Sequence, residues 1–288
     1  MKVVPQAFYK HPNIEKIFVD GLSCVILKRT QSADLQNERY LGAHALTLVL
    51  NGALRVESSE GSLTTAQKNQ MLFLPKGLYM ISDVIPKNES FDAVVFFFDQ
   101  EIIDEFLINF EDTSLQEIKG VLTILYNQNL RLFVDSLLTL YKGKHQNQFT
   151  KPKLLELLHL ISISEEGQTF IHHLKALKSR ERKNIKRFMS DNYHKPLDIE
   201  DYAYLTGRSI STFRRDFKSK FGISPKKWLI QKRLEKAAHL LIKKNDSVTD
   251  ISTQVGYENT SHFIKAFHKK FNTSPKQYQI KYRKKTLI

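Results

Sequence analysis

One motif occurs twice in this chain, as Phe213-Arg-Arg-Asp-Phe-Lys-Ser-Lys-Phe-Gly-Ile-Ser-Pro-Lys-Lys-Trp228 and again as Phe263-Ile-Lys-Ala-Phe-His-Lys-Lys-Phe-Asn-Thr-Ser-Pro-Lys-Gln-Tyr278. In each copy three Phe residues recur at a spacing of four, which places them on one face of a helix. Lys and Arg gather on the opposite face, and a Ser-Pro pair follows the last Phe of each copy. Two basic helices on matching scaffolds predict double-stranded DNA as the partner.

Each copy is preceded by a segment that predicts a short helix and a turn. Asp198 and Ser247 are suited to helix N-caps, and each has an Asp three residues later that can complete a capping box. Gly207 and Gly256 then supply the turn between two helices. The predicted first helices cover residues 198–206 and 247–255, and the second helices begin near Ser209 and Asn259. We therefore expect two helix-turn-helix motifs.

The two motifs are joined by residues 225–244, which contain neither Gly nor Pro after Pro225. A helix of this length is roughly 30 Å long. Successive major-groove faces on one side of B-DNA are about 34 Å apart. The sequence thus predicts a stiff linker helix that can set both recognition helices into adjacent grooves.

The carboxy-terminal part of the chain resembles the DNA-binding domain of the AraC/XylS family of bacterial transcription regulators. Residues 248–278 match the family signature closely, whereas the first copy has Thr206-Gly207-Arg208 where an apolar residue often follows the glycine. The resemblance implies an all-α DNA-binding domain at residues 180–285, with two helix-turn-helix motifs joined by a linker helix. It also implies an activator that binds promoter DNA and contacts RNA polymerase.

By that resemblance, side chains near the start of each recognition helix read base edges. Arg can grip guanine O6 and N7 with two hydrogen bonds, Lys can reach the same acceptors, and hydroxyl side chains contact several bases. The implied readers are Ser211, Thr212 and Arg215 in the first helix, and Thr260, Ser261 and Lys265 in the second. Phosphate contacts are expected from Arg214, Lys218, Lys220, Lys269 and Lys270. The alternative for such side chains is a solvated charge. Core positions are predicted for Phe213, Phe217, Phe221, Phe263, Phe267, Phe271 and Trp228.

The charge of the chain is concentrated in the same region. Apolar residues make up 41% of the 288 residues, which is typical of a globular protein. Lys and Arg outnumber Asp and Glu by 17 in residues 176–288, whereas residues 1–175 have a net charge of −3. Such an excess predicts phosphate neutralisation and a steep salt dependence of binding. A solvated basic surface is the alternative.

Cysteine content and apolar runs indicate the compartment. Cys24 is the single cysteine, so neither an intramolecular disulfide nor a cysteine-based zinc site is expected. The amino terminus lacks an apolar signal core, and no apolar run reaches the roughly 18 residues needed to cross a bilayer. We expect a soluble cytoplasmic protein with no membrane partner.

The first half of the chain has a different pattern. Residues 22–99 contain short apolar runs separated by turn signals, which is typical of closely spaced antiparallel strands. Asn51-Gly52 predicts a hairpin turn. After Asp99 apolar residues recur at helical spacing. The predicted fold class is α+β: an antiparallel β-barrel with flanking helices in residues 1–175, followed by the all-α domain.

The family resemblance extends to this half, because a cupin-like barrel followed by helices is a common sensor and dimerisation arrangement in the family. Pro75-Lys-Gly77 resembles the Pro-X-Gly of the second cupin motif. Enzymatic cupins then place a metal-binding His where this chain has Met80, and the His-X-His of the first motif is missing, with His44 standing by itself. We therefore expect no metal and no cofactor.

Catalysis is the rival class of function. Glu165-Glu166 and His172-His173 are adjacent pairs, and adjacent residues diverge around a helix, so both pairs are expected to be surface charges. No phosphate loop, nucleophile elbow or zinc-protease motif is present in the sequence. We expect no catalytic residues and no enzyme. The alternative is a metal-dependent cupin-type enzyme fused to a DNA-binding domain.

Two hypotheses concern the control of the first domain. The barrel can bind a small effector in an apolar pocket lined by residues such as Phe73, Tyr79, Phe91 and Phe97. It can instead bind protein, either a second copy in a homodimer or a regulatory partner. Residues 151–163 carry Leu on too many sides for one buried stripe, so this helix is either a dimer contact or deep core.

Overall fold

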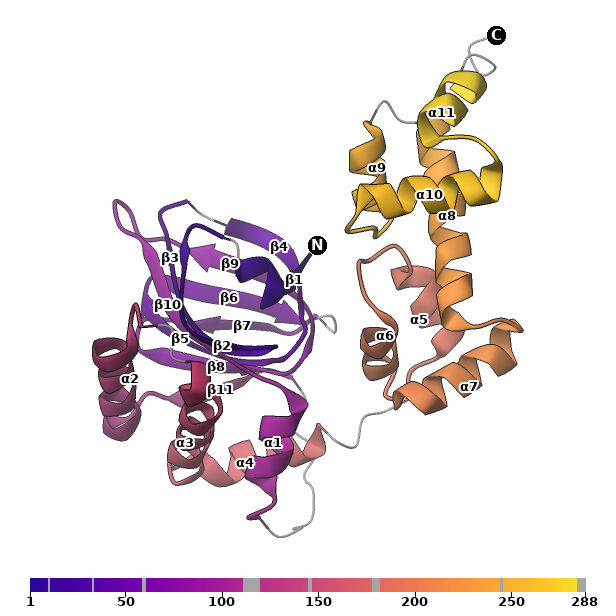
Figure 1. Ribbon diagram of the computed structural model, residues 1–288. Coiled ribbons are helices and arrows are strands. Elements are labelled where there is room, and N and C mark those ends of the chain that lie inside the picture. Colours follow the sequence, from indigo (N-terminus) through magenta and orange to yellow (C-terminus); the bar gives the residue numbers. More distant parts are fainter. Residues whose placement is uncertain are drawn as a thin grey trace. The chain divides into compact units, whose positions relative to one another are not determined.

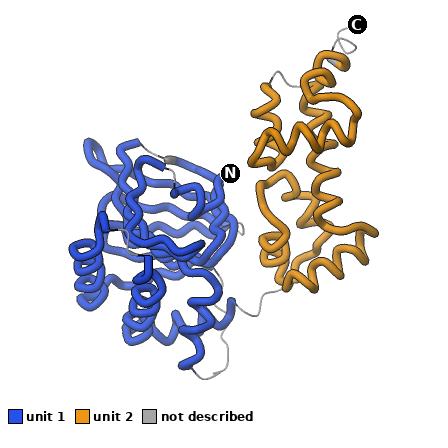
Figure 2. The backbone as a smooth tube through the Cα atoms, in the orientation of Figure 1, with its two compact units in different colours: residues 1–179 blue, residues 180–288 orange. Residues whose placement is uncertain are grey.

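The chain divides into two compact units, Met1–Ser179 and Arg180–Ile288, coloured blue and orange in Figure 2. The computed structural model describes residues 1–9, 11–32, 34–58, 61–110, 120–144, 147–177, 182–243 and 246–283. The predicted domain boundaries at residues 180 and 285 lie outside these ranges.

The first unit contains two β-sheets (Figure 1). One has the order β1 (Lys2–Val4), β4 (Asp34–Leu41), β9 (Gly77–Val84), β6 (Ala53–Ser58), β7 (Leu63–Ala66). The other has the order β11 (Leu122–Leu125), β8 (Gln70–Leu74), β5 (His44–Asn51), β10 (Phe91–Phe98), β3 (Ser23–Thr30), β2 (Ile14–Asp20). The α+β class is confirmed, but the described strands form two open sheets, not one closed barrel.

Among the described strands, β1 and β4 pair in parallel and all other neighbours pair antiparallel. The hairpin predicted at Asn51-Gly52 is wrong, because β5 and β6 belong to different sheets and the turn carries the chain from one to the other. Gly52 has φ +82° there, and a Cβ atom would lie 2.6 Å from the Val84 carbonyl oxygen. The glycine therefore belongs to a crossover between sheets.

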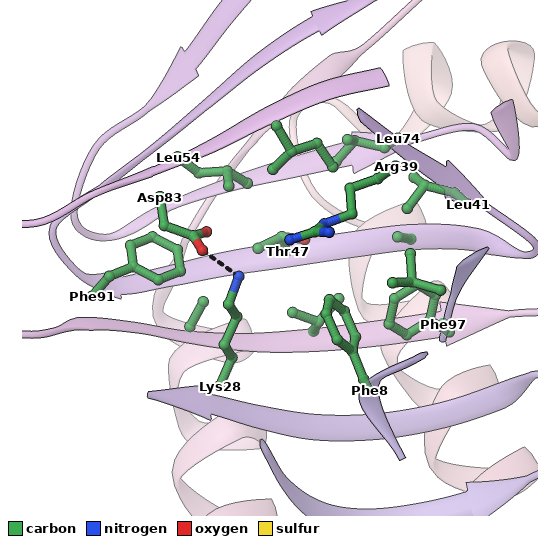
Figure 3. Close-up of a pocket in the computed structure, with 15 residues that line it drawn as sticks. Phe8, Lys28, Arg39, Leu41, Thr47, Leu54, Leu74, Asp83, Phe91 and Phe97 are labelled. Carbon is green, nitrogen blue, oxygen red and sulfur yellow. Dashed lines mark hydrogen bonds and ion pairs between the residues drawn. The ribbon is translucent and has the colours of Figure 1, made fainter. Parts of the chain in front are cut away.

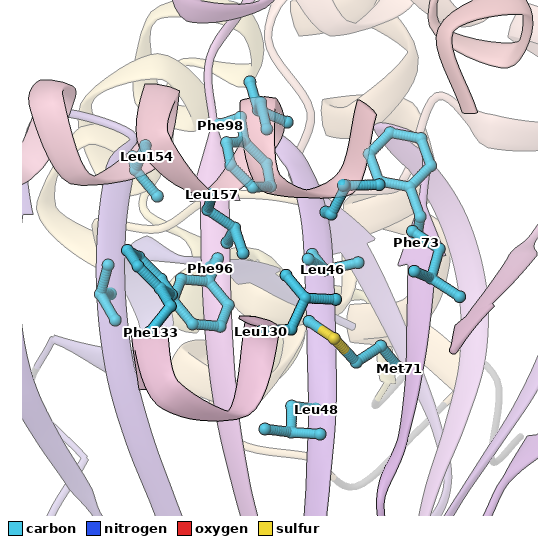
Figure 4. Close-up of a cluster of buried hydrophobic side chains, with 14 of the residues drawn as sticks. Leu46, Leu48, Met71, Phe73, Phe96, Phe98, Leu130, Phe133, Leu154 and Leu157 are labelled. Atoms are coloured by element: carbon cyan, nitrogen blue, oxygen red, sulfur yellow. The ribbon is translucent and has the colours of Figure 1, made fainter. Parts of the chain in front are cut away.

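Strand β10 separates two apolar layers, because its successive side chains point to opposite faces. Phe91, Ala93, Val95 and Phe97 pack between the two sheets. The alternate side chains, which include Phe96, pack instead against a layer of helices, as Figure 4 shows. A strand that is buried on both faces reads as the continuous apolar run seen in the sequence.

The helical layer consists of α1 (Gln100–Leu107), α2 (Gln128–Tyr141), α3 (Thr150–Ser162) and α4 (Gly167–Ala176). Two 3₁₀ turns, Gln6–Phe8 and Asn147–Phe149, complete the unit. Helix α3 lies in the middle of this layer, and Leu154, Leu157, Leu158 and Ile161 are fully buried. Of the two alternatives for residues 151–163, a dimer contact or deep core, these four side chains are therefore core.

The second unit is all-α. Its elements are α5 (Ile185–Asn192), α6 (Ile199–Leu205), α7 (Ile210–Phe221), α8 (Pro225–Lys243), α9 (Val248–Gln254), α10 (Thr260–Phe271) and α11 (Pro275–Arg283). Capping boxes form at Asp198 and Ser247, as predicted. Lys244, the predicted end of the linker helix, lies outside the described residues. The two helix-turn-helix motifs and their linker helix are confirmed.

Aromatic side chains hold each motif to the linker helix α8. Phe213 and Phe217 are fully buried in the first copy, as are Phe263 and Phe267 in the second. The third Phe of each copy is half-buried, and Phe221 lies 5.0 Å from Trp228 between ring centroids. The Phe face of each recognition helix is therefore core, which leaves the basic face outward.

Candidate nucleic-acid interface

The first recognition helix, α7, begins at a side-chain cap. The Ser209 hydroxyl accepts a hydrogen bond from the Thr212 backbone N–H, and this fixes where the helix starts. Burial of the Phe face leaves Ser211 and Arg214 exposed, while Thr212 is half-exposed. The Arg215 side chain is 76% exposed. Lys218 and Lys220 are exposed in the last two turns. The predicted readers thus occupy the first half of the open face, ahead of these lysines.

The second recognition helix, α10, is built in the same way. The Asn259 amide oxygen accepts hydrogen bonds from the backbone N–H groups of Ser261 and His262. Ser261, Lys265 and Lys269 are exposed on the face opposite the buried Phe residues. This helix therefore presents two of its three predicted readers to solvent.

The hydroxyls of Ser211 and Thr212 lie 3.1 and 2.9 Å from that of the cap residue Ser209, at the start of their own helix. The Thr260 hydroxyl lies instead 3.1 Å from that of Ser252, a buried side chain on α9, so it is turned into its own motif. Alignment of the two copies on their first Phe pairs Thr212 with His262 and Ile210 with Thr260. His262 is exposed. The internal repeat therefore identifies His262, which the sequence reading missed, as the counterpart of Thr212.

Lys270 also differs from the predicted phosphate contacts on the open faces. Its ammonium group donates to the Gln231 carbonyl oxygen at 3.1 Å and to Glu235 Oε1 at 3.0 Å, both on α8. Hydrogen bonding from Lys270, with a further contribution from Lys232, lowers the pKa of Glu235. Lys270 thus ties α10 to the linker helix.

Arg208 accounts for the departure of the first motif from the family pattern. Its side chain is only 7% exposed, and Nε donates to Asp216 Oδ2 at 3.1 Å. Nη1 donates to the carbonyl oxygens of Thr206 at 2.6 Å and Lys183 at 3.0 Å. The Arg208 hydrogen bond is the main cause of the lowered pKa of Asp216. In the first motif, hydrogen bonds thus hold the turn to α7. In the second motif, Tyr257 follows the glycine of the turn and packs on Phe263 instead.

A hollow of about 210 Å³ adjoins the first recognition helix. Arg214 and Lys218 of α7 line it together with Lys226, Ser224 and Pro225 at the start of α8. Lys226 was not among the predicted phosphate contacts, because its position beside α7 depends on how α8 packs. Three cations around one hollow suit the approach of a phosphate.

The interior of the first unit contains a small cavity, shown in Figure 3. Its volume is about 40 Å³, and Phe91 and Phe97 are among its lining residues. Of the other two residues predicted for an effector pocket, Phe73 packs on the helical layer, and Tyr79 does not line this cavity and donates to the Pro75 carbonyl oxygen.

Three charged side chains also line this mostly apolar cavity. Lys28 on β3 forms an ion pair with Asp83 on β9, and Arg39 on β4 lies alongside them (Figure 3). A second hollow of about 140 Å³ adjoins the cavity and shares Lys28, Arg39, Asp83 and Phe8 with it. The charges therefore lie at the boundary of the two spaces.

In the part of the chain that the structure describes, no cluster of three or more His, Cys, Asp or Glu side chains could hold a metal ion. His44 accepts a hydrogen bond from the Lys76 backbone N–H through Nδ1. The prediction that His172-His173 is a surface pair is wrong for His173, which is fully buried and packs edge-on against Phe73. Within the described ranges, no helix combines the length and apolar character required to cross a membrane.

Two family models match the chain. Residues 44–173 match the ExsA N-terminal regulatory domain, and residues 202–281 match a helix-turn-helix domain. The first match covers the region from β5 to α4, and the second covers both recognition helices.

The chain is also similar to curated relatives and to a solved structure. The chain is 29% identical over 131 residues to the virulence regulon transcriptional activator VirF of Yersinia enterocolitica, which covers 46% of the chain and 48% of VirF, so it spans about half the length of that relative. It is 24% identical over 236 residues to the HTH-type transcriptional regulator ExsA of Pseudomonas aeruginosa, covering 79% of the chain and 83% of ExsA. It is 31% identical to the solved C-terminal domain of the response regulator yesN of Fusobacterium nucleatum, covering 33% of the chain and 93% of that domain with a TM-score of 0.32.

Proposed function

We propose, from the premise that this chain belongs to the AraC/XylS family of transcription regulators, that it binds a promoter sequence through both helix-turn-helix motifs and activates transcription there. One observation carries the proposal: α7 and α10 bury their Phe faces and leave polar and basic faces exposed on two matching scaffolds. A helix presented in this way can enter the major groove. RNA polymerase contact at the promoter completes the activation.

Base recognition is assigned to the first two turns of the two helices. In α7 the readers are Ser211, Thr212 and Arg215, as the sequence predicts. In α10 they are Ser261, His262 and Lys265, with His262 in place of Thr260 because Thr260 is turned towards Ser252. Phosphate contacts are assigned to Arg214, Lys218, Lys220, Lys226 and Lys269. Lys270 has a positioning role, since its ammonium group is held by α8.

The mechanism is binding, so the chain is not an enzyme. Control acts through the first unit, for which the two hypotheses were a small effector and a protein partner. Ligand pockets have volumes of about 300–1,000 Å³. Neither the interior cavity of about 40 Å³ nor the adjoining hollow of about 140 Å³ reaches that range. These volumes favour association with a second copy or a regulatory protein. A screen of small metabolites should then leave the melting temperature unchanged, because only a ligand that binds the folded state raises it.

The test of the proposed function is selection of DNA by the full chain from a random-sequence library, followed by affinity measurements on the selected DNA. Arg215→Ala/Lys265→Ala should abolish the preference for selected over random DNA. Lys232→Ala removes an exposed cation from α8, which is not a recognition helix, and should preserve that preference. Failure of the unsubstituted chain to enrich any sequence would refute the proposal. An undiminished preference in the double variant would refute the assignment of readers.

A further inference from the structure

Arg233, in the middle of the linker helix α8, contacts both the segment that leads into the first helix-turn-helix motif and the turn of the second motif. Its guanidinium donates four hydrogen bonds to backbone carbonyl oxygens. Three acceptors lie between α5 and α6, immediately before the first motif, and the fourth lies in the turn between α9 and α10 of the second motif. They are Tyr193 at 2.8 Å, Lys195 at 2.6 Å, Leu197 at 3.2 Å and Gly256 at 3.1 Å.

The chemistry of this contact requires arginine. A guanidinium presents five N–H donors in a rigid planar fork, whereas a lysine ammonium is a compact group with three donors. Only the planar fork can reach carbonyl groups that approach from both motifs at once. Loss of this donor would leave partly buried carbonyl groups without a hydrogen bond, which lowers the stability of the fold unless water takes the donor's place.

The two motifs also meet directly beside Arg233. Gly256 has φ +86°, and a Cβ atom at this position would lie 2.7 Å from the His194 carbonyl oxygen and 3.1 Å from Arg233 Cζ. The turn of the second motif therefore rests on the segment between α5 and α6, which leads into the first motif. A side chain at Gly256 would have to push the two motifs apart.

We infer that Arg233 is a positioning residue that fixes the second helix-turn-helix motif against the first, and so sets the spacing at which α7 and α10 read DNA. The linker helix alone holds each motif by side-chain packing on a different part of its surface. Arg233 joins the motifs to one another through backbone atoms. The statement about DNA spacing rests on the proposed function, whereas the statement about the geometry of the two motifs does not.

The first test measures that geometry without DNA. Spin labels are attached in the full chain at Ser219→Cys on α7 and His268→Cys on α10, both exposed positions, and the distribution of distances between them is recorded. Cys24 stays unlabelled, since it is buried and burial raises its pKa to about 12. Arg233→Gln should broaden the distribution, and Arg233→Lys should broaden it less. Lys243→Gln removes the same charge from an exposed side chain at the end of α8 and should leave the distribution narrow. An unchanged distribution in Arg233→Gln would overturn the inference.

A second variant attacks the same contact if Arg233→Gln fails to fold. Gly256→Ala introduces a Cβ atom against His194 and Arg233 in a left-handed backbone conformation. Gly222→Ala is its matched control, because Gly222 has φ +73° and no heavy atom would lie within 4 Å of the added Cβ atom. Both variants place a side chain at a positive φ angle. Broadening in Gly256→Ala alone supports the inference, and equal behaviour of the two variants contradicts it.

The DNA test uses the sequence selected by the full chain, with one base pair inserted between the parts read by α7 and α10. The unsubstituted chain should lose at least about tenfold in affinity, the cost of one misplaced base contact. Arg233→Gln should bind both spacings with nearly equal affinity, which a loss of stability alone would not produce. If the parent selects no DNA, the proposed function fails, and the distance measurement still decides the role of Arg233. A spacing penalty that persists in the variant refutes the role in DNA spacing.

Discussion

Arg215 and Lys265 stand at the same place in the two copies of the repeat, two residues after the first Phe of each recognition helix. These two side chains determine which bases each helix can recognise. Arg215 can bind guanine with two hydrogen bonds, while Lys265 reaches the same acceptors as a single point charge. The first motif is therefore expected to discriminate its bases more sharply than the second.

Lys265→Ala should lower the preference for the correct base by about 1–3 kcal/mol at one position of the DNA site. Lys269→Ala, one turn further along the same helix, should weaken binding to all sequences alike and reduce the salt slope by about one. Affinities for a panel of single-base variants of the selected DNA separate the two patterns. Equal losses across the panel for Lys265→Ala would show that Lys265 is a phosphate contact.

His173 links the stability of the first unit to pH. Burial lowers its pKa from 6.5 to about 4. Between these two values the unfolded chain binds a proton that the folded chain does not, so stability falls as the pH drops from about 6.5 to about 4. The loss should be on the order of 3 kcal/mol, and it is absent above pH 6.5. The free energy of unfolding, measured by denaturant titration across this range, checks the slope.

The matched variants are His173→Phe and His172→Gln. His173→Phe removes the buried titrating ring and should flatten the pH dependence between 6.5 and 4. His172 is half-exposed, and its substitution should leave the slope intact. An unaltered slope in His173→Phe would assign the acid sensitivity to other groups.

At the scale of elements, the two sheets of the first unit are joined by a buried ion pair. Lys28 on β3 of one sheet meets Asp83 on β9 of the other, with side chains 13% and 2% exposed. A buried charge left alone is costly, while an apolar pair of similar volume can replace both charges with little loss. The pair therefore constrains how the sheets pack.

Asp83→Ala should destabilise the first unit by about 3–5 kcal/mol, because it leaves the Lys28 charge in an apolar cavity. Lys28→Met/Asp83→Leu should recover most of that loss. The control is Arg29→Ala on the same strand, which breaks an exposed pair with Asp92 and should cost at most about 1 kcal/mol. Thermal unfolding of the four proteins checks the series. Equal destabilisation by Asp83→Ala and Arg29→Ala would contradict it.

Element prediction succeeded where a local pattern specifies the element. The Phe spacing in α7 and α10 and the caps at Asp198 and Ser247 are local signals, and the helices follow them. The hairpin prediction at Asn51-Gly52 failed because the same local turn can close a hairpin or carry the chain from one sheet to another. The pairing of strands decides between these outcomes, and it depends on residues far apart in the sequence.

At the scale of the whole molecule, charge is divided unequally between the units. Residues 176–288 carry a net charge of +17 and residues 1–175 a net charge of −3. Counterion release then makes DNA affinity fall steeply with salt. Six to ten phosphate contacts would reduce the affinity by about 10³–10⁵ between 50 and 200 mM salt.

The salt prediction is checked by measuring the dissociation constant of the full chain for selected and random DNA over this range. The slope should be similar for both, because phosphates contribute to both complexes. Lys218→Ala/Lys226→Ala should reduce the slope by about two if both side chains at the hollow beside α7 contact phosphates. An unchanged slope would remove this hollow from the DNA interface.

The amino-acid sequence alone was sufficient for the α+β class, for the twin helix-turn-helix motifs and for the exposed basic faces, because helix periodicity, caps and charge act between near neighbours. The tertiary structure alone decided which side chains meet across long separations. It turned Thr260 towards Ser252, held Lys270 on α8 and placed Phe73 on the helical layer. It also brought Arg233 against the segment before the first motif and the turn of the second. These contacts depend on the packing of whole elements, and packing is set by the summed burial of distant residues, which no local pattern contains.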